Sequence, residues 1–171
     1  MYRMDIVVND TNIFIDLYSV GLIDAFFNLP FEVHTVDFVV NEIEDEQQSL
    51  LVNQLIDNGR LTVHSFAAEE LLEVLELQAN AGGNVSVTDC AVWQYAKQRD
   101  YVLLTGDRQL RNKAIESNVT VKGILYVFDQ LVECSILPPK DAATKLKELM
   151  AINARLPKGL IQERIVKWER I

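Results

Sequence analysis

The stretch IVVNDTNIFIDLYS, residues 6–19, indicates the first elements of the fold. Its first three residues are β-branched and form a short apolar run, which is typical of a buried strand. Apolar side chains then recur at Ile13, Phe14, Leu17 and Tyr18, the spacing of one helix face. Between the two patterns stands Asp10, a favoured residue for beginning a helix. The stretch therefore predicts a buried strand, an aspartate at its carboxyl end and then a helix.

Strand-like and helical patterns go on alternating along the rest of the chain, which indicates an α/β fold with a mostly parallel sheet. No repeat, low-complexity segment or linker divides residues 1–171, so we expect a single domain in which 138–171 form a C-terminal helical extension. The helix over 37–57 is expected to break near the acidic cluster 42–46, and a turn is expected at 157–159. Further strands are expected at 31–36, 61–63, 102–104 and 119–121, and further helices at 11–19, up to 27, 67–79, 86–99, 107–117, 123–134 and 138–153.

The composition is that of an ordinary globular protein. The chain has 171 residues, of which 49% are hydrophobic, and this is enough for one core. No signal peptide is expected at Met1-Tyr2-Arg3-Met4, which leads directly into a strand-like run, and no stretch is apolar enough to span a membrane. The two cysteines, Cys90 and Cys134, are too few for a disulfide scaffold, and both are expected to be buried. A reduced, cytoplasmic setting is the simplest interpretation.

Charge is distributed unevenly along the chain. The net charge of −9 argues against nonspecific nucleic-acid binding over the whole surface. Residues 1–137 contain eight Lys and Arg and 21 Asp and Glu, which gives a net charge of −13. Residues 138–171 contain eight Lys and Arg and four Asp and Glu, which gives a net charge of +4. Together with the apolar Ile161, Ile165 and Trp168, this asymmetry predicts that the extension contacts a second copy, as a homodimer, or another protein. Its basic residues are also candidates for phosphate contact: Lys140, Lys145, Lys147, Arg155, Lys158, Arg164, Lys167 and Arg170.

Four acidic residues stand where a divalent cation would need them. Asp10 and Asp107 each follow a predicted strand, and the carboxyl ends of parallel strands meet at one edge of a sheet. Glu42 and Asp89 lie on predicted helices that can face that edge. Carboxylates packed together repel one another, and Mg²⁺ or Mn²⁺, which prefer hard oxygen ligands, would neutralise them. Each acid also has a structural interpretation: Asp10 and Asp107 as helix caps, Asp89 in a capping box with Ser86, and Glu42 on a solvated helix face.

Four segments carry a resemblance to a known family. They are Asp10-Thr11-Asn12, VVNEI at 39–43, SVTDCA at 86–91 and TGDRQL at 105–110. In this order and at these intervals they resemble the motifs of the PIN-domain nucleases, over about residues 5–135. Within the family the chain is most similar to prokaryotic members related to the toxins of toxin–antitoxin pairs. In one departure, Leu110 stands where the family often has an aromatic residue, although leucine still fills an apolar position.

This resemblance implies a three-layer α/β/α sandwich with a central parallel sheet. It implies a Mg²⁺- or Mn²⁺-dependent endoribonuclease that hydrolyses RNA, with an antitoxin protein as a candidate partner. It assigns Asp10, Glu42, Asp89 and Asp107 to the metal site as the catalytic acids. The implied supporting residues are Thr11 or Asn12, which would contact a metal-bound water or a phosphate, and Thr105, which would support the loop carrying Asp107.

Basic residues follow Asp107 on one short predicted helix. Arg108, Arg111 and Lys113 could bind RNA phosphates beside the metal site, or could form an ordinary solvated helix face. Two other functions compete with the nuclease. The first is a non-catalytic PIN-like module that binds RNA or a protein, against which the presence of all four acids argues. The second is a phosphohydrolase with an aspartate nucleophile at a strand end, whose motif requires aspartate where Asn12 stands.

Several other polar residues are expected to lie outside the site. His34 and His64 have no second His or Cys at ligand spacing, so both are expected to be structural. Asp16, six residues after Asp10, is expected to face a different side of its helix. Gly82-Gly83 lacks the Lys-Ser/Thr of a phosphate loop and predicts a mobile lip beside Asp89.

Overall fold

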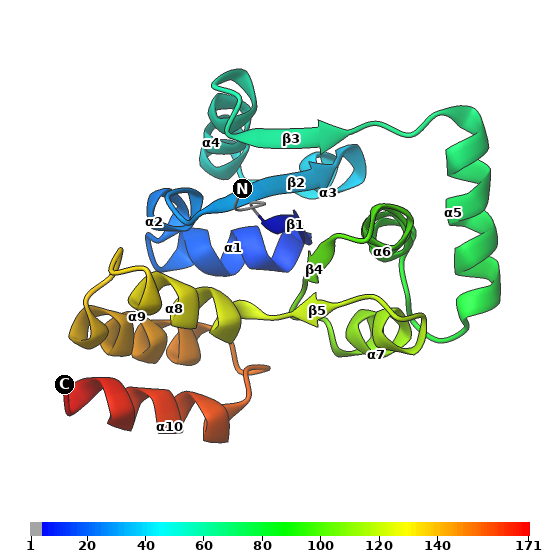
Figure 1. Ribbon diagram of the computed structural model, residues 1–171. Helices are drawn as coiled ribbons and strands as arrows, with labels where there is room; N and C mark the ends of the chain where they lie inside the picture. The colour runs from blue at the N-terminus through cyan, green and yellow to red at the C-terminus, as the bar shows by residue number, and fades with distance from the viewer. Residues whose placement is uncertain (1–4) are drawn as a thin grey trace.

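Strand β1 (Asp5–Asn9) lies at the centre of a five-stranded sheet in the computed structural model, which describes residues 5–171 (Figure 1). The strand order is β3-β2-β1-β4-β5, and every neighbouring pair is parallel. Val7 pairs with Val33 on one side and with Val102 on the other. Val7 and Val8 are both buried, as expected of a central parallel strand whose two faces are covered. The other strands are β2 (Phe31–Val36), β3 (Leu61–His64), β4 (Val102–Leu104) and β5 (Val121–Lys122).

Helices cover this sheet and connect its strands. Figure 1 shows α1, α2 and α8 gathered at the left of the molecule and α5, α6 and α7 at the right. The predicted α/β/α fold with a central parallel sheet is therefore confirmed. The helices are α1 (Thr11–Ser19), α2 (Ile23–Phe27), α3 (Asp37–Glu42), α4 (Glu46–Asp57), α5 (Ala68–Ala81), α6 (Val87–Arg99), α7 (Arg108–Glu116), α8 (Ile124–Glu133), α9 (Pro139–Ile152) and α10 (Lys158–Glu169).

The strand order reverses next to β1. From β1 the chain builds outward through β2 to β3, and then crosses back to place β4 on the opposite side of β1. Ligands of open α/β sheets bind outside the carboxyl ends of the strands at such a reversal. In this chain the reversal lies between β1, which leads into Asp10, and β4, which leads into the loop with Asp107.

Some local boundaries differ from those expected. The helix predicted over 37–57 breaks into α3 and α4, as the acidic cluster suggested, and Asp45 begins α4 by accepting a hydrogen bond from the Gln48 amide. The last strand lies at 121–122 rather than 119–121. The turn predicted at 157–159 is wrong, because Pro157 is the N-cap of α10 and proline is well suited to a helix start.

The C-terminal extension folds back on its own chain. Helix α10 packs on α9, and α9 packs on α8 (Figure 1). Ile161, Ile165 and Trp168 are only 0%, 1% and 3% exposed. The expectation that these three residues help to form a partner surface is therefore wrong. Their spacing of four and three residues is that of a helix face, and α9 already covers that face.

Other expectations concern the surface of the chain. No helix within residues 5–171 is long and apolar enough to cross a membrane. The expectation that residues 1–4 carry no signal peptide lies outside the described residues. Cys90 is buried as expected, and burial raises the pKa of its thiol to about 11. Cys134 is exposed, contrary to expectation, because it is the C-cap of α8 and lies beyond the apolar face of that helix.

Replacing Ile165 by alanine tests whether α10 belongs to the core. We expect Ile165→Ala to lower the free energy of unfolding by about 2–5 kcal/mol, because it leaves a cavity between α10 and α9. The measurement is urea denaturation followed by circular dichroism. Leu160→Ala, on the same helix but at a side chain that is 50% exposed, is the matched control and should change stability by less than about 0.5 kcal/mol. Equal effects of the two variants would contradict the packing of α10.

Candidate metal and nucleic-acid site

Asp10 lies at the carboxyl end of β1 and is only 3% exposed. As the N-cap of α1, its Oδ1 accepts a hydrogen bond of 2.8 Å from the Thr11 amide. Its Oδ2 accepts two more, from Asn12 Nδ2 at 2.9 Å and from Thr105 Oγ1 at 2.7 Å. The side chain is therefore held in one orientation by groups from the start of α1 and from the loop that follows β4.

Asn12 and Thr105 join the two strand ends. The side-chain oxygen of Asn12 accepts a hydrogen bond of 2.8 Å from the Gly106 amide. A Cβ atom added to Gly106 would lie 3.2 Å from that oxygen, so the close approach of α1 to this loop favours glycine. Thr105 Oγ1 accepts from the Asp107 amide at 3.0 Å, and Asp107 in turn caps α7 by accepting from the Leu110 amide at 2.8 Å. The loop after β4 is thus tied to Asp10.

Glu42 and Asp89 approach the same edge from two different helices. Glu42, the last residue of α3, accepts a hydrogen bond of 2.8 Å from Thr11 Oγ1. Asp89, in the first turn of α6, forms a capping box with Ser86, whose amide donates to Asp89 Oδ2 at 2.8 Å. Three of the predicted acids are therefore helix-capping residues, as their structural interpretation proposed, and a capping carboxylate can also bind a cation. The two interpretations are compatible.

Burial and neighbouring negative charge raise the pKa of two of these carboxylates, Asp10 and Asp89. Burial, followed by the charges of Asp89 and Glu42, raises the pKa of Asp10 to about 6, although hydrogen bonds from Thr105 and Thr11 oppose the shift. Burial, together with the charges of Asp107 and Glu42, raises the pKa of Asp89. Within residues 5–171, no Lys, Arg or His forms an ion pair with any of the four acids. In the described part of the chain these acids therefore carry negative charge that no ion pair neutralises.

The donor chemistry of this cluster fits a hard divalent cation. Three carboxylate oxygens receive no hydrogen bond from the described part of the chain: Glu42 Oε1, Asp89 Oδ1 and Asp107 Oδ2. Mg²⁺ and Mn²⁺ bind such oxygens and retain several waters. In the arrangement described for residues 5–171, no three acidic, His or Cys side chains form a ready ligand set. The charge and chemistry of the site therefore suit a cation, and the side chains would have to move closer to bind it.

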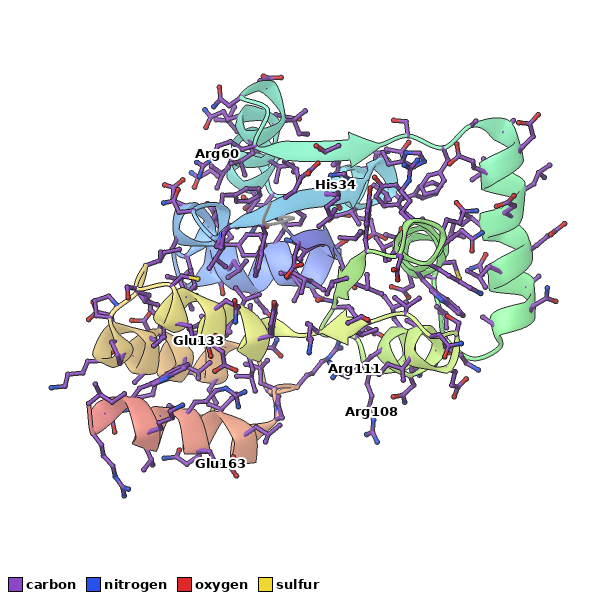
Figure 2. All side chains as sticks on the ribbon, viewed as in Figure 1. His34, Arg60, Arg108, Arg111, Glu133 and Glu163 are labelled. Carbon is purple, nitrogen blue, oxygen red and sulfur yellow. The ribbon has the colours of Figure 1, made fainter. Side chains whose placement is uncertain are left out.

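Two arginines stand at the rim of the cluster. Arg108 and Arg111 are exposed on α7, and Figure 2 shows both side chains projecting from the beginning of that helix. Arg111 lies close to the end of β4, and Gly123 is the residue that both approach. A Cβ atom added to Gly123 would lie 3.7 Å from Arg111 Nη1 and 3.6 Å from the carbonyl oxygen of Thr105, which follows β4. Lys113 lies 3.9 Å from Glu116 on the same helix, which fits an ordinary solvated face.

A contact that the sequence did not predict, between Asn84 and Gln109, holds the loop before α6. The side-chain oxygen of Gln109, on α7, accepts a hydrogen bond of 3.0 Å from the Asn84 amide. This contact links Gly82-Gly83, predicted as a mobile lip, to the helix that Asp107 caps. Gln109 lies within the segment quoted for the resemblance, but its partner is 25 residues away and carries no motif of its own.

The two histidines lie apart from the acidic cluster. His34 is buried between Tyr95, whose hydroxyl is 2.8 Å from Nδ1, and Glu32, whose carboxylate is 2.8 Å from Nε2. His64 stacks on Tyr95 and contacts Glu70 at 2.6 Å. Their contacts are those of the structural residues that the sequence predicted.

Comparison with known proteins places this geometry in a family. The family model described as PIN domain matches residues 6–170, almost the whole chain. The chain belongs to the PIN-domain family. It is 27% identical over 144 residues to the endoribonuclease Nob1 of Methanocaldococcus jannaschii, covering 80% of this chain and 71% of that protein. The crystal structure of PAE2754 from Pyrobaculum aerophilum matches this PIN domain with a TM-score of 0.53 and 16% identity, covering 76% of this chain and 98% of the other, which supports the fold alone.

The raised pKa of Asp10 predicts how the stability of the metal-free PIN domain depends on pH. The pKa rises from 3.8 to about 6 on folding, so the contribution of this group is fully present below pH 3.8 and is lost as the pH rises through 6. The difference corresponds to about 3 kcal/mol. In EDTA, Asp10→Asn should therefore gain up to about 3 kcal/mol of unfolding free energy relative to the parent between pH 4 and pH 7.5, measured by urea denaturation.

Asp141→Asn provides the control for this comparison. Asp141 is an exposed acid in the first turn of α9, away from the cluster. Its substitution should show no comparable change with pH. The prediction is contradicted if Asp10→Asn and the parent differ in unfolding free energy by the same amount at pH 4 and at pH 7.5. Folding would then not raise the pKa of Asp10.

Proposed function

We propose that this PIN domain is a metal-dependent endoribonuclease that hydrolyses phosphodiester bonds of RNA. One observation carries the proposal: Asp10 is buried at the strand-order reversal near the charges of Asp89 and Glu42, and no Lys, Arg or His of residues 5–171 forms an ion pair with any of the four acids. Such a cluster is costly for the fold unless a cation neutralises it. The similarity to an endoribonuclease and the family membership support RNA as the substrate.

Each group in the site has a role in the proposal. Asp10, Glu42, Asp89 and Asp107 hold Mg²⁺ or Mn²⁺ and are the catalytic acids. When bound, such an ion supplies Lewis-acid stabilisation of the negative charge that develops on a phosphodiester. The supporting residues keep the acids in place: Thr11 orients Glu42, Asn12 and Thr105 orient Asp10, and Thr105 also holds the backbone of Asp107.

Arg108 and Arg111 bind substrate phosphates in this proposal. Both are exposed at the start of α7, directly after Asp107, and neither forms an ion pair in the described part of the chain. An acidic cluster repels RNA, and positive charge beside it offsets that repulsion. Arginine suits this role because its planar guanidinium donates two parallel hydrogen bonds to a phosphate.

The biological setting that we propose is the toxin half of a toxin–antitoxin pair. Its support is the resemblance of the four sequence segments to toxin-related prokaryotic PIN domains. In this setting RNA cleavage inhibits growth and an antitoxin protein restrains the enzyme. Induced expression in a bacterial host should then arrest growth, and co-expression of a cognate antitoxin protein should relieve the arrest. A homodimer also stays a prediction, which light scattering can test.

The central prediction of the proposal concerns RNA cleavage. The purified protein should cut single-stranded RNA in Mn²⁺ or Mg²⁺ and lose this activity in EDTA. Mutating a group that merely orients a metal ligand lowers metal affinity or activity by about 10–100-fold. Replacing a ligand itself should have a larger effect, so Asp10→Asn and Asp107→Asn should each lower kcat/KM by at least about 100-fold. Gel-based cleavage of a 5′-labelled RNA measures both effects.

Asp141→Asn serves as the control here too, because it removes the same charge from an exposed position on α9. Its kcat/KM should match that of the parent. Equal cleavage by Asp10→Asn and the parent would contradict the assignment of the site. Tight RNA binding without any cleavage would favour the alternative function, a non-catalytic PIN-like RNA-binding module.

A further inference from the structure

A buried carboxylate outside the acidic cluster anchors the connection between α9 and α10. Asp16 lies on α1, is 8% exposed, and has a pKa that burial raises. Its two oxygens accept hydrogen bonds from Asn153 Nδ2, at 3.1 and 3.3 Å. Asn153 is the C-cap of α9 and begins the linker 153–157. A contact between residues 137 positions apart thus fixes the linker against α1.

This anchor lies one helical turn from the proposed site. Asp16 follows Asn12 by four residues, and side chains with that spacing are neighbours on a helix, about 5–6 Å apart at Cβ. Asn12 itself contacts Asp10 and the Gly106 amide. Figure 1 shows the linker at the end of α10 that faces β5 and α7. The linker is therefore held about one helical turn along α1 from Asn12, which contacts Asp10.

The Asp16–Asn153 contact also holds the backbone of a basic residue, Arg155. Its backbone amide donates a hydrogen bond of 3.0 Å to the side-chain oxygen of Asn153, so one asparagine side chain contacts both Asp16 and the backbone of Arg155. The Arg155 side chain is exposed and has no acidic partner in residues 5–171. By contrast, three other basic residues of the extension are engaged: Lys145 with Glu148, Lys147 with Glu169, and Arg164 with Asp129.

We propose that the Asp16–Asn153 contact positions Arg155 to bind a phosphate of the RNA, so that it adds to the positive charge that Arg108 and Arg111 place beside the acidic cluster. The inference rests on the proposed function and extends the substrate-binding surface to the C-terminal extension. Positive charge beside a negative site offsets the repulsion of a polyanion. Because the anchor restrains the linker before RNA arrives, little conformational entropy is lost on binding. Asp16 and Asn153 are positioning residues, and Arg155 makes the contact.

The test compares RNA binding by matched variants. Fluorescence anisotropy with a short labelled single-stranded RNA in EDTA measures affinity over a range of salt concentrations. Arg155→Gln should weaken binding roughly 3- to 10-fold and lower the salt slope by about 0.7, the value for one phosphate contact to a single strand. Asn153→Ala should have a similar effect. Asp16→Asn retains an oxygen acceptor for Asn153 and should bind RNA as the parent does.

Arg170→Gln is the matched control. It removes the same charge at the far end of α10, which lies about 18 Å along the helix from its start. Its affinity and salt slope should equal those of the parent. In cleavage assays, Arg155→Gln should raise KM with kcat unchanged, and it should leave the rise in melting temperature caused by Mn²⁺ unchanged, because neither the acids nor the fold is altered.

The outcomes separate this inference from the proposed function. If the parent cuts RNA and Arg155→Gln binds and cuts as the parent does, the inference is overturned while the nuclease assignment stands. An equal loss of affinity in Arg170→Gln also overturns it, because the effect would then be one of overall charge. If the parent neither binds nor cuts RNA, both proposals fail.

Discussion

Repulsion between carboxylates at the carboxyl edge of the sheet is the constraint on which the site depends. Asp10 is nearly completely buried near the charges of Asp89 and Glu42, and no basic residue within 5–171 forms an ion pair with it. A buried carboxylate needs hydrogen-bond donors, and Asp10 receives hydrogen bonds from Thr11, Asn12 and Thr105. These bonds also join β1 to β4, so the same contacts stabilise the sheet edge and arrange the acids.

Helix starts supply the rest of the electrostatic support. Asp10 and Asp107 are N-caps, and Asp89 lies in the first turn of α6. The positive end of a helix dipole favours negative charge at each of these positions. The topology then brings the three helix starts together, because α1 and α7 follow adjacent strands and α6 packs on β1, β2 and β4. Capping therefore explains how the acids are tolerated, and the proposed cation-binding role would give them a common function.

Much of this arrangement could be predicted from the sequence, and the exceptions have physical causes. Asp10 and Asp107 were expected to meet because both follow parallel strands, whereas Glu42 and Asp89 depended on the family resemblance. The burial of Ile161 and Ile165 was missed because an apolar helix stripe does not reveal which surface covers it. The Asp16–Asn153 contact was missed for a similar reason: neither residue belongs to a motif, and only the packing of the C-terminal helices brings them together.

The central claim is that the acidic cluster binds a divalent cation. The most direct measurement is a crystal structure of the protein soaked in Mn²⁺, with anomalous diffraction recorded at the manganese edge. We expect a strong anomalous peak in contact with Asp10 and Asp107, and no such peak in crystals of Asp10→Asn. A peak only at other positions, or none at Mn²⁺ concentrations that support RNA cleavage, would contradict it.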